Sequence, residues 1–172
     1  MVDIQTVSVM LASASVIAGV VYYALQIRHQ SHMIQQQNKV RQTDLVMRLY
    51  LTWGSEEYKK GFGPFLGLEI KDYDSFVKKY GSITSPERSP VWTDVDRYTW
   101  FFNGIGYLVY YKFADVEQVD DLFGYGVITM WEKTKPLVEG WRKQLNIPKS
   151  TRWFEYLYDE MKKREQNLQP TS

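Results

Sequence analysis

A long apolar segment near the start of the chain contains no charged side chain. It runs from Ile4 to Leu25, and its only ionisable groups are two tyrosines. As an α-helix these 22 residues would be about 33 Å long, which matches a bilayer hydrocarbon core of about 30 Å. A soluble core helix near a chain end usually keeps one polar face, which this segment lacks. The pattern therefore predicts one transmembrane helix that anchors the protein in the cell membrane.

Two other interpretations fit this segment less well. A cleavable signal peptide has basic residues before its apolar part, but here the only charged side chain in that position is Asp3. The other alternative is the buried helix of a soluble core.

Small side chains recur along one face of the predicted span, at intervals of four, three and four residues. They are Ser8, Ala12, Ser15 and Gly19. A stripe of this kind lets a second helix approach closely inside a membrane. We therefore predict a packing face for a membrane protein partner or for a second copy in a homo-oligomer. The alternative is that the stripe only reflects how common small residues are in single spans.

The charges that flank the span predict its orientation. Arg28, Lys39 and Arg41 follow the span, and no Lys or Arg precedes it. Because basic residues are enriched on the cytoplasmic side, we expect the N-terminus outside and the C-terminal domain in the cytoplasm.

The rest of the chain has the spacing of helices. Residues 28–42 are polar, rich in Gln and free of Gly and Pro, so they predict a helical stalk. Beyond them apolar positions recur at helical intervals, and no strand-like alternation persists. We predict an all-α fold, with a single N-terminal transmembrane helix followed by a compact multi-helix domain. The predicted divisions are an anchor at 1–27, a stalk at 28–42, a helical cytoplasmic domain at 43–166 and a C-terminal tail at 167–172.

Local signals divide the folded part further. Capping residues stand at four predicted helix starts: Asp72 or Asp74, Thr93, Asp115 and Ser150. The glycines and the proline of "GFGPFLG" at 61–67 predict a loop. Pro136 predicts a break or a fresh first turn within a long helical pattern.

One predicted helix, beginning near Thr93, is crowded with aromatic rings. Its 14 uncharged residues between Arg97 and Lys112 are too few for a second span and are typical of a buried core helix. The rings cover more than one face, so either the helix is buried all round or some rings line a groove for an apolar or peptide ligand. We favour burial, and the candidate groove residues are Tyr98, Phe102, Tyr107 and Tyr111.

Charge and cysteine content narrow the function. The chain has 21 basic and 20 acidic residues, a balance that excludes a nucleic-acid partner bound through a basic face. It has no cysteine, which excludes disulfides, thiolate metal sites and a cysteine nucleophile.

No motif predicts a reaction. His29 and His32 are the only histidines, and they lack the further ligands that a metal site needs. The glycines of 61–67 do not match a nucleotide-binding fingerprint. The carboxylates of the folded part are interpreted as helix starts: Asp94, Asp96, Glu117, Asp120 and Asp121. We therefore predict no catalytic residue, no cofactor and no metal.

The chain resembles a prokaryotic family of membrane-anchored helical proteins that is classed as a domain of unknown function. The resemblance rests on the early span, on "TDLVMRLYLTWGSEEYKK" and on "FFNGIGYLVYYKFADVEQVDDLFGYGVITMWEKTKP". It implies an all-α fold and membrane attachment, and it implies no activity and no functional residue.

The sequence thus predicts a single-pass protein that is a non-catalytic interaction or accessory subunit of a membrane complex. The alternative is a membrane-tethered domain that binds or acts on an apolar small molecule in an aromatic-lined helical pocket.

Overall fold

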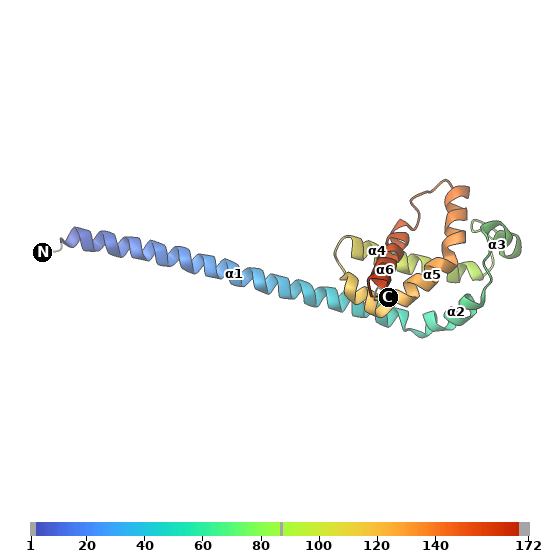
Figure 1. The fold of residues 1–172 in the computed structure, drawn as a ribbon, viewed down its shortest axis with the longest axis horizontal. Coiled ribbons are helices and arrows are strands. Elements are labelled where there is room, and N and C mark those ends of the chain that lie inside the picture. Colours follow the sequence, from blue (N-terminus) through green and yellow to red (C-terminus); the bar gives the residue numbers. More distant parts are fainter. Residues whose placement is uncertain (1–2, 87, 169–172) are drawn as a thin grey trace. The chain divides into compact units, whose positions relative to one another are not determined.

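The computed structural model describes residues 3–86 and 88–168, without the side chains at positions 6, 7, 9, 12 and 168. Helices are the only regular secondary structure in these ranges, which confirms the predicted all-α class. They are α1 (Ile4–Trp53), α2 (Glu56–Gly67), α3 (Tyr73–Tyr80), α4 (Val91–Tyr110), α5 (Val116–Gln144) and α6 (Arg152–Leu168) (Figure 1). The chain divides into two units, Met1–Arg41 and Gln42–Ser172.

The first unit is helical from Ile4 to its end. All residues from Ile4 to Arg41 whose burial is described are exposed, with the exception of Gly19, which is half-buried. Within the described residues we find no helix that is both long and apolar enough to cross a membrane. This finding does not support the predicted span, in which the side chain of Ala12 lies outside the described set.

Helix α1 continues into the second unit and ends at Trp53. The polar run after Arg28 contains neither Gly nor Pro, so nothing in it interrupts the helical hydrogen bonds. The helix stops where Gly54 follows, and the Gly54 amide donates to the carbonyl oxygen of Tyr50 at 2.8 Å. Val46, eight residues before Gly54, is already part of the buried core.

The core of the second unit is built around α4, which lies along α6 (Figure 1). Rings dominate this core: Phe102 stacks on Phe154 with ring centres 5.2 Å apart, and Trp131 meets Phe154 edge-on at 5.0 Å. The prediction that α4 is a buried core helix is confirmed. Its buried residues are Trp92, Val95, Tyr98, Thr99, Phe102, Ile105, Gly106 and Val109.

The predicted loop at 61–67 is wrong, because this segment is the second half of α2 and contains Pro64 inside the helix. Tertiary contacts outweigh the local signals. Phe65 is buried against Tyr98, with ring centres 5.0 Å apart. The ammonium of Lys133 also donates to the Leu66 carbonyl at 2.8 Å, which holds the end of the helix.

Two further boundary predictions are wrong and two are confirmed. Helix α4 begins at Val91, before Thr93, and α5 runs without a break through Pro136. Asp72 caps α3 by accepting from the Ser75 amide, and Asp115 caps α5 by accepting from the Glu117 and Gln118 amides.

Candidate functional site

Helix α4 places the four predicted groove residues in two different environments. Tyr98 and Phe102 are fully buried in the core, whereas Tyr107 and Tyr111 are 44% and 48% exposed. The cause is helical geometry: at about 100° per residue, Tyr107 lies about 140° around the helix from Phe102. The structure therefore brings together the members of each pair, but it does not bring the two pairs together.

Tyr107 and Tyr111 belong to a cluster of five exposed or half-buried rings on α4 and α6. We call this cluster the tyrosine patch, and its members are Tyr107, Tyr110, Tyr111, Trp153 and Tyr156. The ring of Trp153 is central, because Tyr110 tilts against it at 4.3 Å and Tyr111 meets it edge-on at 5.7 Å. Tyr156 closes the cluster, with its ring centre 5.2 Å from that of Tyr110.

Two residues of α4 determine how closely α6 packs against it at the patch. Gly106 is fully buried where the backbone of α6 passes, and a Cβ atom at this position would overlap the carbonyl oxygen of Trp153. Asn103 lies one turn earlier, and its side-chain oxygen accepts from the amides of Trp153 at 3.2 Å and Phe154 at 3.3 Å. These amides belong to the first turn of α6, where backbone donors lack the usual partner four residues earlier, although the Phe154 amide also donates to the Thr151 carbonyl at 3.1 Å. Asn103 therefore caps α6 from another helix, in the role predicted for Ser150.

The residue types of the patch are ones that are common at protein interfaces. The guanidinium of Arg152 lies over the Trp153 ring at 4.3 Å, a cation–π geometry. Burial raises the pKa of Tyr156, and Glu160 adds to that effect. Tyr, Trp and Arg are the residue types that contribute most binding energy at protein interfaces. Because each phenol has an apolar ring and a polar tip, the patch can bury area and donate hydrogen bonds together.

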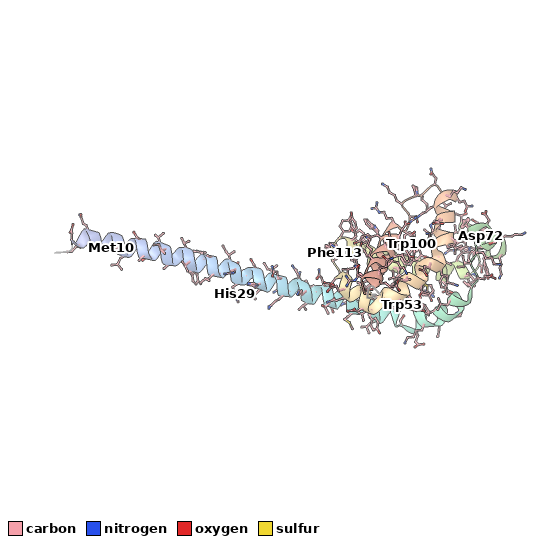
Figure 2. All side chains as sticks on the ribbon, in the orientation of Figure 1. Met10, His29, Trp53, Asp72, Trp100 and Phe113 are labelled. Atoms are coloured by element: carbon pink, nitrogen blue, oxygen red, sulfur yellow. The ribbon has the colours of Figure 1, made fainter. Side chains whose placement is uncertain are left out.

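A concave feature lies elsewhere on the domain, where α1 meets α2 and α5. We call it the aromatic cleft. It has a volume of about 370 Å³ and is lined by Tyr50, Trp53, Gly54, Tyr58, Lys59, Phe62 and Leu122. Trp53, labelled in Figure 2, lines the cleft, and its ring stacks on that of Phe101 with ring centres 5.5 Å apart. Lys59 is the one charged side chain among the lining residues.

Four of the five acidic residues singled out in the sequence lie in ion pairs, and the fifth, Asp121, forms none within the described residues. Asp94 pairs with Arg97 at 2.7 Å and Asp96 with Arg88 at 2.9 Å. Asp120 pairs with Arg164 at 2.9 Å. Glu117 lies 3.9 Å from Arg164, at the edge of the same interaction. Among the described residues, no group of three or more His, Asp or Glu side chains is arranged to hold a metal ion.

The small-residue face of α1 keeps its hydroxyl groups within the helix. Ser8 donates to the Ile4 carbonyl at 2.9 Å, and Ser15 donates to the Leu11 carbonyl at 2.8 Å. Hydroxyls bonded in this way do not need water as a partner. The packing role predicted for Ser8, Ala12, Ser15 and Gly19 stays a prediction.

Sequence reasoning found two members of the patch and missed the other three. Trp153 lies outside the core face of α6, whose fully buried residues are Phe154, Leu157 and Met161. A signal was present, because Trp153 and Tyr156 are three residues apart and alternate with the charged Arg152 and Glu155. That spacing places both rings on the charged side of the helix.

Residues 12–161 match a family described as "Domain of unknown function (DUF4760)". The match confirms the resemblance to a helical domain of unknown function, and it carries nothing about membrane attachment or source. Neither the curated proteins nor the solved structures include a match to the chain.

Proposed function

Because the chain belongs to the DUF4760 family, whose name assigns no activity, we propose its function from the geometry of its own surface. The protein is an interaction or accessory subunit that is tethered to a membrane by the start of α1. Its folded domain binds a protein partner through the tyrosine patch. This role is non-catalytic.

The observation that carries the proposal is the exposure of three contacting tyrosines around one tryptophan. Tyr107, Tyr110 and Tyr111 are each between 44% and 48% exposed, although their rings pack on one another and on Trp153. On soluble domains, a contiguous exposed aromatic surface of this kind is typical of an interaction site. The rings already pack on Trp153 in the free domain, so they would lose little side-chain entropy when a partner binds.

Four features of α1 support the tether. The stretch from Ile4 to Leu25 carries no charge, and its large apolar side chains are exposed along the helix (Figure 2). Exposed apolar area on this scale is unfavourable in water and favourable in lipid. The hydroxyls of Ser8 and Ser15 are bonded to their own helix, and the first basic residues follow the stretch rather than precede it.

Membrane fractionation of the full chain tests the tether. We expect wild-type protein to stay with vesicles after an alkaline wash. Placing Lys at both Val16 and Val20 should release it, because a Lys near a span centre disfavours insertion by about 2.5–3.5 kcal/mol. Gln35→Lys adds the same kind of charge outside the apolar stretch and should leave the protein in the pellet. Release of the wild-type protein would contradict the tether.

Site-specific photo-crosslinking tests the patch. A benzophenone amino acid in place of Tyr111 should give a discrete adduct of higher mass when cells are illuminated. The same amino acid in place of Tyr125, which is 79% exposed on α5, is the matched control and should give none. Equal adducts at both positions, or no adduct at Tyr111, would oppose the proposal.

The aromatic cleft favours a second candidate function, the binding of an apolar small molecule. A volume of about 370 Å³ is within the usual range of ligand sites. An anilinonaphthalene sulfonate probe should then bind saturably, and Leu122→Trp should fill the cleft and abolish binding. Tyr125→Trp is the control for added indole surface. Non-saturable binding, or binding equal in the two variants, would exclude this function.

A further inference from the structure

The small-residue face of α1 continues without a break into the polar part of the helix. Positions separated alternately by four and three residues stay on one side of an α-helix, as the a and d positions of a heptad do. We call the described positions of this series between residues 15 and 40 the α1 seam. They are Ser15, Gly19, Tyr22, Gln26, His29, Met33, Gln36 and Val40.

The last turns of the seam are hollowed in a way that suits an incoming side chain. A shallow depression of about 380 Å³ is lined by Met33, Gln36, Gln37, Val40 and Arg41. The first four of these residues stand at i, i+3, i+4 and i+7, which is the four-residue arrangement that receives a knob in a coiled coil. Met33 and Val40 are 48% and 69% exposed, so nothing in the described chain fills the depression.

The charges beside the seam favour a second copy of this chain as the occupant. With Met33 and Val40 at a positions, Lys39 stands at g and Asp44 at the following e, five residues later. In a parallel, in-register pair of helices, g of one copy faces the following e of the other. Lys39 of each copy would therefore face Asp44 of the other, and the contact would form twice. Within the described residues Lys39 makes no ion pair. Asp44 accepts from Arg48 through Oδ2 at 2.8 Å and is 60% exposed, so a second cation can still approach its carboxylate.

We propose that two copies of the chain associate in parallel and in register through the α1 seam. This inference rests on the proposed function, because tethering in one orientation aligns the two helices. Ser15 and Gly19 then allow close approach of the backbones inside the bilayer. Met33 and Val40 interlock outside it, and polar seam residues such as Gln36 fix the register.

Single-cysteine crosslinking tests the seam directly, because the chain has no cysteine of its own. Full-length Val40→Cys and Met33→Cys should form disulfide dimers in membranes under mild oxidation, since paired a positions lie within disulfide reach. Asn38→Cys and Gln35→Cys lie on the other side of the helix and are the matched controls. We expect roughly tenfold more dimer from the seam variants than from the controls.

The outcomes separate this inference from the tether. Equal crosslinking at all four positions, or no crosslinking at the seam, would overturn the parallel pair. The dimer yield can be measured in the membrane pellet or in the released fraction. Release of wild-type protein by alkaline washing would overturn the tether alone if the seam variants still crosslink selectively. Retention in the pellet without seam crosslinks would overturn the pair alone.

A charge exchange tests the register. Lys39→Glu and Asp44→Lys should each lower the yield of the Val40→Cys dimer by about two- to fivefold, because like charges then face one another. The double exchange should restore the yield. A double variant that stays as low as either single variant would contradict the in-register arrangement.

Discussion

Gly106 lies directly against the backbone of Trp153, fifty residues later in the chain. A Cβ atom on Gly106 would overlap the Trp153 carbonyl oxygen and would stand 3.2 Å from the Cβ of Leu157. Helices α4 and α6 approach this closely only because position 106 has no side chain. The same approach brings Tyr107 and Tyr110 onto the Trp153 ring, so the tyrosine patch depends on a glycine that is itself fully buried.

We expect Gly106→Ala to separate α4 from α6 and to lower the free energy of unfolding by about 1–3 kcal/mol. The matched control is Gly104→Ala, because a Cβ at exposed Gly104 meets nothing within 4 Å. Removing a glycine from an exposed helix position should raise stability by about 0.5–1 kcal/mol. Urea unfolding of the two variants measures the difference. Equal stabilities would mean that the close approach at Gly106 is absent.

Asn103→Ala should weaken the start of α6. The Trp153 amide would lose its acceptor, while the Phe154 amide would keep the Thr151 carbonyl, so stability should fall by about 1 kcal/mol. Asn103→Asp keeps an acceptor at the N-terminus of α6, so stability should return to near the wild-type value. Hydrogen exchange of the Trp153 amide reports the change locally. Unchanged exchange in Asn103→Ala would show that the cap is not formed.

Lys133→Met should loosen the end of α2. The Lys133 ammonium donates to the carbonyls of Leu66 and Leu68, and methionine keeps the length of the side chain without the donor. We expect a loss of about 1–2 kcal/mol in the free energy of unfolding. Lys135→Met removes an exposed charge from the same helix and should change stability by less than about 0.5 kcal/mol. Thermal and urea unfolding distinguish the two variants, and equal effects would contradict the capping role.

The stability of the domain should fall at high pH partly because of Tyr98. Burial raises the pKa of the Tyr98 phenol to about 12, and the nearby Asp94 carboxylate adds to that effect. The unfolded chain loses this proton near pH 10, so folding holds the proton more tightly and stability declines between pH 10 and 12. The contribution is at most about 2–3 kcal/mol. Tyr98→Phe should remove this share of the decline, and an identical pH profile in both proteins would contradict it.

Local signals in the sequence were enough to predict the helical class and two of the caps. Asp72 and Asp115 accept from amides two or three residues later, a distance that local sequence determines. Helix α2 could not be predicted in this way, because its residues 61–67 contain Pro64 and three glycines. It is held by Phe65 in the core and by Lys133 from α5, contacts that no local pattern shows.

The candidate site was only half predictable for the same reason. A rotation of about 100° per residue already separates Tyr107 from Phe102, so the division of α4 into a core face and a surface face follows from the sequence. The partner ring Trp153 does not, since its position is set by Gly106 and Asn103 across fifty residues of chain. The exposure of the tyrosine patch depends on how α4 and α6 pack together, which the sequence of either helix alone does not show.

The mass of the full chain purified in mild detergent tests the central claim, that the domain works by binding a protein partner through the tyrosine patch. We expect the wild-type chain to elute in a complex with one stoichiometric partner. The double variant Tyr110→Ser, Tyr111→Ser should lose that partner and remain folded, while Tyr125→Ser should retain it. A wild-type chain that elutes without any partner, or a partner retained equally by all three proteins, would contradict the account.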